Sequence, residues 1–364
     1  MLSVCKRMRQ AGKQIAGLLP LLLLLVLACF EGNAVVQLAT PLKEGSAATG
    51  APLAASPKEF GSFPSVTNST IMFLHVFKCA GTSLRQVFMS LAEQEGWTGG
   101  IADEGCQIPQ SSRRRLHSGD GWLQGHICLN VQNTLINRNT QKWQVAGMKV
   151  IAGHFMYDFH QYATPPQLLI TTLRNPLELF VSSNQFKHRE ETKTLKAATE
   201  FVVFRMKERL RWRDPTDLAF IRRFLGTEAA SSYRAQKVYT EEESLAMVST
   251  AVEHLNTFWV VGVVEQYEGF IEVLKHALDP GFKHADVWES ALTVKDNGSP
   301  VRSRDVLSSI DQDLVREFNA TTLAFQWQVY DIALQLWDTR CREVLPHQDH
   351  DRLCSVPGYR RAFS

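Results

Sequence analysis

From residue 70 onward, short apolar runs alternate with longer amphipathic segments. Four runs are almost continuously apolar, which is typical of strands buried on both faces. They lie at residues 71–77, 149–152, 168–173 and 258–264. Apolar positions at helical spacing predict helices elsewhere, at residues 83–95, through much of 176–255, at 269–278, and over 306–337 with a break near Asn319. Because strands alternate with helices, we expect an α/β fold, with a parallel sheet and helices on both faces.

The most apolar stretch of the chain lies earlier, at residues 15–30, IAGLLPLLLLLVLACF. Basic residues precede it, and no acidic residue occurs before Glu31. A basic flank followed by an uncharged apolar stretch indicates a signal peptide or a membrane anchor. We expect a retained signal anchor with residues 1–14 in the cytoplasm, and a cleaved signal peptide is the alternative. Either interpretation places the rest of the chain in the secretory lumen.

The segment between this stretch and the first predicted strand has few large apolar side chains. Residues 31–69 are rich in Ala, Gly, Ser, Pro and Thr, so they bury too little surface to offset the entropy of ordering. We expect a flexible stem there and a single lumenal domain over residues 70–364. Three Asn-x-Ser/Thr triplets agree with a lumenal address, because they are acceptors for N-glycosylation. They begin at Asn68, Asn297 and Asn319.

Charge and cysteine content narrow the classes of partner and compartment. The net charge is +2, and removing the four basic residues that precede the apolar stretch leaves −2. A domain without a basic excess gives no indication of a nucleic-acid partner. Five cysteines follow the apolar stretch, in a compartment that permits disulfides, although five cysteines do not fix a connectivity. The expected pairs are Cys341–Cys354 and Cys106–Cys128, which leaves Cys79 unpaired.

Candidate chemistry begins directly after the first apolar run, in HVFKCAGTSL, residues 75–84. A strand, a turn containing Gly81 and hydroxyl groups at a helix start form an anion site, because backbone N–H groups and the helix dipole both favour phosphate. Lys78 adds a full positive charge. A Walker loop would place the lysine after the second glycine, so this is a different kind of loop. An ordinary strand-to-helix turn remains the alternative.

A second anion-binding pattern lies at residues 170–186, ITTLRNPLELFVSSNQF. Arg174 ends a predicted strand, and Pro176 suits the first turn of a helix. Ser182 then falls in the second turn of that helix. A guanidinium makes two parallel hydrogen bonds to a phosphate, and a hydroxyl completes the shell. The alternative is that Arg174 pairs locally and Ser182 lies on the surface.

A histidine closes a third strand, in VIAGHFMYDFH. Histidine is the usual proton acceptor near neutral pH, so His154 is our candidate general base. His75, His126 and His160 are the competing candidates. Because ligands of parallel sheets bind beyond the carboxyl ends of the strands, we expect Lys78, His154 and Arg174 to lie around one site.

Taken together, the lysine-first loop with GTS and the Arg-x-Pro segment with its serine resemble the membrane-bound Golgi sulfotransferases that use 3′-phosphoadenylyl sulfate (PAPS). The pattern is most similar to the heparan sulfate and uronyl 2-O-sulfotransferases, over residues 71–340. The resemblance implies the P-loop-like sulfotransferase fold and a single-pass type II Golgi membrane protein. It implies that Arg174 and Ser182 hold the 3′-phosphate. It assigns the 5′-phosphosulfate to Lys78, Cys79, Ala80, Gly81, Thr82 and Ser83.

The implied activity is sulfuryl transfer from PAPS to a glycan hydroxyl, with no metal. His154 removes the acceptor proton, as a Gly-His pair does in the 2-O-sulfotransferases, and Lys78 stabilises charge on the leaving side. Three basic clusters could contact an anionic polysaccharide acceptor. The alternative interpretation is that each cluster is a solvated helix face. The clusters lie at residues 113–115, 187–189 and 205–213. We interpret residues 347–351, HQDHD, as a solvated polar tail, and a metal site is the alternative.

Several positions depart from the common family pattern, which leaves the acceptor open. They are Phe77, Cys79, Ala80, Asn175 and Leu179. Two weaker features agree with the family, the strand and helix at residues 259–274 and the Tyr330-Asp331 pair in the last helix. Two competing functions remain: a nucleotide-dependent phosphotransferase that uses the loop for ATP, and a catalytically inactive, sulfotransferase-like glycan-binding protein.

Overall fold

The computed structural model describes residues 66–103, 127–130, 145, 147–211, 221–227, 239–293 and 301–356, with 127–130 as backbone. No helix within these ranges is long and apolar enough to cross a membrane. Several predicted features lie outside the described residues. They are the anchor at 15–30, most of the stem, Cys106, the cluster at 113–115, His126, Arg213 and the triplet at Asn297.

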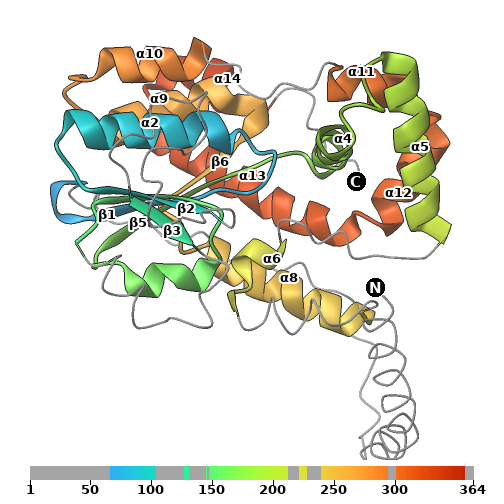
Figure 1. The fold of residues 1–364 in the computed structure, drawn as a ribbon, viewed down its shortest axis with the longest axis horizontal. Helices are drawn as coiled ribbons and strands as arrows, with labels where there is room; N and C mark the ends of the chain where they lie inside the picture. The colour runs from blue at the N-terminus through green and yellow to red at the C-terminus, as the bar shows by residue number, and fades with distance from the viewer. Residues whose placement is uncertain are drawn as a thin grey trace, which may run out of the picture. The chain divides into compact units, whose positions relative to one another are not determined.

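Six parallel strands form one sheet in the order β3-β2-β4-β1-β5-β6, which confirms the predicted α/β class (Figure 1). The strands are β1 (Thr70–Leu74), β2 (Gly99–Asp103), β3 (Ile127–Asn130), β4 (Val150–Gly153), β5 (Gln167–Leu173) and β6 (Val260–Val263). All five residues of β1 are buried between β4 and β5, which explains their continuous apolar character. The sequence did not predict β2 or β3, and β2 begins with two glycines that interrupt any apolar run.

Helices cover both faces of the sheet, as expected (Figure 1). On one face lie α2 (Gly81–Gln94), α9 (Tyr267–Leu278) and α10 (Ala285–Thr293). On the other lie α6 (Ile221–Phe224) and α8 (Glu241–Leu255). The long helix α13 (Ala324–Val344) packs on β6 and contacts both α8 and α9, so it closes the edge of the sheet.

Beside the sheet, four helices share a hydrophobic cluster of their own. They are α4 (Pro176–Lys187), α5 (Leu195–Arg211), α11 (Ser303–Ser308) and α12 (Gln312–Thr321). Helix α4 contributes to both clusters, because Leu179 packs in the main core and Phe180 in this second one. Packing on two sides fixes the rotation of α4, which is the helix that carries the predicted Ser182. The predicted helical break falls between the end of α12 at Thr321 and the start of α13 at Ala324.

Short elements complete the described chain. They are the 3₁₀ turns η1 (Val66–Asn68), η4 (Tyr157–Tyr162), η5 (Val264–Gln266) and η6 (His347–Asp349), and the one-turn helix α14 (His350–Leu353). Residues 66–69, which the sequence assigns to the end of the stem, contact the sheet. The Nζ atom of Lys149 donates to the carbonyl oxygens of Val66 and Ser69.

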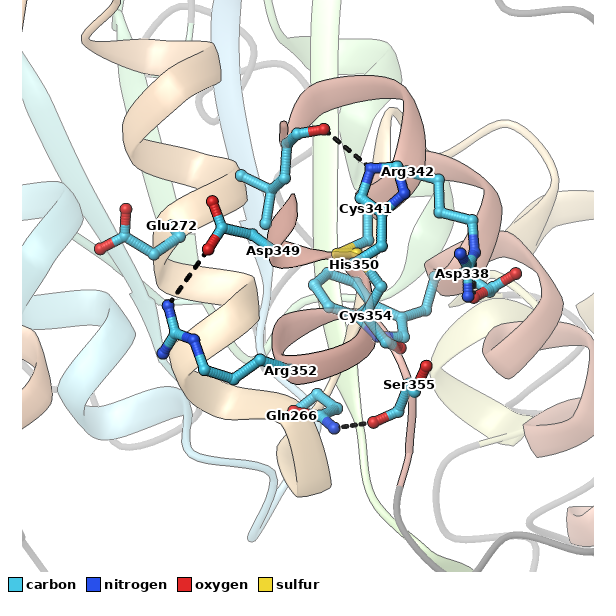
Figure 2. Close-up of a disulfide and its surroundings, with 12 residues drawn as sticks. Gln266, Glu272, Asp338, Cys341, Arg342, Asp349, His350, Arg352, Cys354 and Ser355 are labelled. Atoms are coloured by element: carbon cyan, nitrogen blue, oxygen red, sulfur yellow. Dashed lines mark hydrogen bonds and ion pairs between the residues drawn. A yellow bond between two sulfur atoms is a disulfide. The ribbon is translucent and has the colours of Figure 1, made fainter. Parts of the chain in front are cut away.

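The predicted Cys341–Cys354 disulfide is present and joins α13 to the end of α14 (Figure 2). The indole N–H of Trp337 donates to the carbonyl oxygen of Cys354 over 3.0 Å, and the Gln266 amide donates to the carbonyl oxygen of Ser355. These contacts hold the last described turn against α13 and α9. Cys79 is a buried free thiol, as expected.

Candidate functional site

A cleft of about 640 Å³ lies at the carboxyl ends of the central strands. Residues that follow β1, β4 and β5 all line it, because the carboxyl ends of parallel strands meet at one edge of the sheet. Lys78, His154 and Arg174 are therefore brought together, as the sequence predicts. The lining also includes the predicted residues Ala80, Gly81, Thr82, Ser83 and Ser182.

The loop between β1 and α2 has an unusual backbone. Lys78 and Ala80 have φ angles of 61° and 57°, in the left-handed region that side chains other than glycine rarely occupy. Between them, the N–H of Cys79 donates to Val76, and its carbonyl accepts a hydrogen bond of 2.6 Å from the Thr172 hydroxyl. The Cys79 side chain is fully buried, and Cys79 is not among the residues that line the cleft, unlike the other predicted residues of this loop. Strain of this kind persists where the surrounding structure holds it, and it is common at ligand sites.

Helix α2 points its N-terminus at the cleft. Its N-cap residue is Ala80, which has no side-chain oxygen to satisfy the first N–H groups of the helix. Gly81, Thr82 and Ser83 form that first turn and line the cleft. Helix α2 has 14 residues, and its uncapped N-terminus lies beside a lysine. The free N–H groups and the helix dipole at this end both favour an anion.

Gly81 is required by a close approach to His75. A Cβ atom on Gly81 would lie 1.6 Å from Cδ2 of the His75 ring. That ring is buried and stacks on His154 with 4.0 Å between centroids. Burial is the main cause that lowers the pKa of His75 well below its usual value, so this histidine is neutral. His75 therefore lines the cleft, but its lowered pKa makes it a poor proton acceptor.

His154 has a defined tautomer. Its Nδ1 atom lies 3.0 Å from the main-chain carbonyl oxygen of His75, which can only accept, so Nδ1 is the donor and, in the neutral ring, Nε2 carries the lone pair. The preceding Gly153 allows β4 to approach β2, because a Cβ there would lie 1.8 Å from the Ala102 carbonyl oxygen. His154 then donates its backbone N–H to that same oxygen over 2.7 Å. The competing His160 forms a hydrogen bond of 2.6 Å through Nδ1 to the main-chain carbonyl oxygen of Tyr157, and it is not among the residues that line the cleft.

Lys78 lies in a cluster of positive charge. Its Nζ atom is 4.4 Å from the centre of the Phe186 ring, and the Arg189 guanidinium lies 4.8 Å from the same centre. Burial, followed by the charges of Arg189 and Arg174, lowers the pKa of Lys78 to about 8. A bound anion would offset this repulsion and favour the charged lysine.

Arg174 combines a local ion pair with a position in the cleft. Its Nη2 lies 3.0 Å from Glu178, and the other carboxylate oxygen of Glu178 is 2.9 Å from Nε of Arg304. Burial alone would raise the pKa of Glu178, but the hydrogen bonds from the two arginines outweigh it and lower that pKa. The Nε atom of Arg174 is buried and has no hydrogen-bond partner among the described residues. An anion in the cleft would supply one.

Ser182 lies where the sequence predicts it, in the second turn of α4, and its side chain lines the cleft while being largely buried. The alternative of a surface serine is therefore wrong. Two of the departures from the family pattern also have structural roles. Asn175 caps α4 by accepting from the N–H groups of Leu177 and Glu178, and Leu179 packs in the main core.

Glu265, which the sequence analysis missed, braces the turn that carries Arg174. One carboxylate oxygen accepts from the N–H of Asn175 over 2.8 Å, and the other accepts from the Tyr330 hydroxyl over 2.6 Å. Burial raises the pKa of Glu265, and these hydrogen bonds offset only part of that rise. Its position directly after the apolar run at 258–264 was the available signal. Arg304 and Phe186 were also missed, and Arg304 has no strand end to mark it.

Metal ligation has no candidate in the part of the chain that the structure describes. No group of three or more His, Cys, Asp or Glu side chains there is placed to hold an ion, and this includes residues 347–351. Within that segment, His350 instead hydrogen-bonds the carbonyl oxygen of Leu345 over 2.9 Å.

Comparison with known proteins assigns no family. No protein-family model matches the chain, and no curated protein matches it significantly. Any function must therefore be inferred from the motifs and from the geometry of the cleft.

Proposed function

We propose that this protein is a sulfotransferase that moves a sulfuryl group from PAPS to a hydroxyl of a glycan. The observation that carries the proposal is the meeting of three groups in one cleft. A lysine beside an uncapped helix start, an arginine with a buried serine, and a histidine with its Nε2 lone pair all line it. Each group suits a different part of this chemistry.

The cleft residues fit a donor with two anionic ends. Lys78 and the first turn of α2 would hold the 5′-phosphosulfate, as the sequence resemblance implies. Arg174 and Ser182 would hold the 3′-phosphate, and the buried Nε atom of Arg174 has an unmet hydrogen bond to give. PAPS supplies an activated sulfuryl group when bound, so the protein needs to align the reactants and manage charge.

His154 would take the proton of the acceptor hydroxyl on Nε2 as the oxygen attacks sulfur. The hydrogen bond from Nδ1 to the His75 carbonyl holds the ring in the tautomer that this requires. Lys78 would stabilise the charge that develops on the phosphate as the sulfur–oxygen bond breaks. At the end of the step, the sulfuryl group is on the acceptor oxygen, the proton is on His154 and the negative charge is on the leaving bisphosphate.

The proposed setting is the Golgi lumen, with residues 15–30 as the anchor and a glycan as the acceptor. Of the two basic clusters that the structure describes, residues 187–189 are the better placed to meet an acceptor, because Arg189 stacks on Phe186 in the cleft wall. Arg205 of the α5 cluster instead pairs with Glu208 on the same helix. That pairing favours the solvated-helix interpretation for Arg205.

Calorimetric titration of the full-length chain in detergent tests the donor assignment. The ligands are adenosine 3′,5′-bisphosphate, AMP and ATP. We expect the bisphosphate to bind best, and Lys78→Ala and Arg174→Ala to weaken it about 10- to 100-fold, the loss of one charged hydrogen bond. Lys207→Ala, on α5 outside the cleft lining, is the control. Preference for ATP, or unchanged binding in both cleft variants, contradicts the proposal.

A further inference from the structure

Phe77 is an exposed aromatic residue in a loop that is otherwise packed. Its side chain is 36% exposed, whereas the neighbouring Val76 and Cys79 are 2% and 0% exposed. Single exposed apolar residues are common on protein surfaces. Phe77, however, lines the cleft, at the position where the sequence departs from the family pattern.

Two rings of the cleft wall hold Phe77 in place. Its ring packs edge to face on Phe186, with 5.3 Å between centroids and 76° between planes. The ring centroid of Phe77 also lies 6.3 Å from that of His154, with 46° between the ring planes. Neither phenylalanine belongs to the hydrophobic clusters of the described residues, so their apolar area contributes little to the core. The rings instead form an apolar wall of the cleft beside the candidate base.

The face of Phe186 is already used by cations. Lys78 and Arg189 lie 4.4 Å and 4.8 Å from its centre. These contacts orient Phe186, and Phe186 in turn supports Phe77. Of these two phenylalanines, Phe77 is thus the more exposed, and its ring lies close to that of His154.

We infer that Phe77, supported by Phe186, is the platform on which a pyranose ring of the acceptor stacks. The inference rests on the proposed function and names the acceptor side of the same cleft. The C–H groups on one face of a sugar ring carry partial positive charge, which suits the negative face of an aromatic ring. Stacking there would leave a ring hydroxyl within reach of His154, so Phe77 is a specificity-determining residue.

Binding of oligosaccharides to the full-length chain tests the platform directly. The probes are hyaluronan, chitin and maltose-series hexasaccharides, with a tyrosine-containing peptide as the competing ring-bearing acceptor. Saturation-transfer NMR reports which protons touch the protein, and calorimetry gives affinity. Each probe is titrated with and without saturating adenosine 3′,5′-bisphosphate, so the platform is tested even if the donor assignment fails.

We expect at least one hexasaccharide to bind through its ring C–H protons. Phe77→Leu should weaken that binding about tenfold, the size of one stacking contact, and leave bisphosphate affinity within about twofold. Phe77→Tyr should restore glycan binding, because it keeps the ring. Phe282→Leu is the matched control, since Phe282 is also exposed and contacts a histidine and a lysine, but away from the cleft lining.

Three results would overturn the platform: equal glycan affinity in Phe77→Leu and the parent, binding of the peptide alone, or binding of no hexasaccharide under either condition. Loss of bisphosphate binding by the parent is a separate result. It contradicts the proposed function and leaves the glycan titrations to decide the platform.

Discussion

The Nδ1 atom of His154 lies 3.0 Å from the main-chain carbonyl oxygen of His75. Because a carbonyl only accepts hydrogen bonds, this contact sets which ring nitrogen carries the proton. Strand β1 ends just before His75, and its last residue, Leu74, pairs with Gly153 of β4. The tautomer of the candidate base is therefore determined by the register of two neighbouring strands.

Replacing His154 should remove turnover without removing the donor site. We expect His154→Ala to lower sulfuryl transfer about 10²- to 10⁴-fold, the usual contribution of a general base. His154→Asn is the sharper variant, because its amide N–H can replace Nδ1 but nothing replaces Nε2. The measurement is transfer of labelled sulfur to a glycan library, with bisphosphate affinity measured in parallel. His160→Ala is the control, and an active His154→Asn enzyme would disprove the assignment.

Donor binding should become coupled to pH through Lys78. Because its pKa is about 8, Lys78 of the unliganded protein loses its proton as the pH rises through 8. A bound anion favours the charged form, so binding above pH 8 should take up as much as about one proton, and affinity should fall as the pH rises.

Calorimetry in buffers of different ionisation enthalpy measures that uptake. Lys78→Arg should bind without it at pH 8.5, because arginine stays charged. Proton uptake that persists unchanged in Lys78→Arg would assign the coupling to another group.

Adding one methyl group at Gly81 should disturb the site through His75. The new Cβ would overlap the buried imidazole, so Gly81→Ala should destabilise the fold by about 1–3 kcal/mol, as overpacking does. Urea unfolding measures this. In a His75→Ala background the overlap disappears, and the cost of Gly81→Ala should fall below about 1 kcal/mol. An equal cost in both backgrounds would show that His75 is not the obstacle.

The two described Asn-x-Ser/Thr triplets should differ in glycosylation if the domain is lumenal. Asn68 is exposed in η1. Asn319 lies in α12, and its side-chain oxygen accepts from the Trp327 indole over 3.2 Å. We expect Asn68→Gln to remove a glycan and Asn319→Gln to leave the glycosylation of the protein unchanged. Electrophoretic mobility with and without glycosidase checks this, and an unmodified Asn68 in secretory cells would count against the lumenal address.

The sequence alone determined the central part of the sheet and the residues at its strand ends. Buried parallel strands require continuous apolar runs, so the sequence predicted β1, β4, β5 and β6. Lys78, His154 and Arg174 follow the first three of these strands. Their meeting could be predicted because parallel strands end at one edge. Strand β2 was missed because Gly99 and Gly100 give no apolar signal, although its pairing with β4 positions Gly153.

Only the tertiary structure decided how these residues are held and what surrounds them. Glu265 contacts Asn175 across 90 residues, and Arg304 reaches Glu178 across 126. Phe77 meets Phe186 because α4 is fixed between two hydrophobic clusters. Apolar periodicity reports only the local environment of each residue. Partners that are distant in sequence follow from strand order and helix packing, and these determine the tautomer, the ion pairs and the aromatic wall of the cleft.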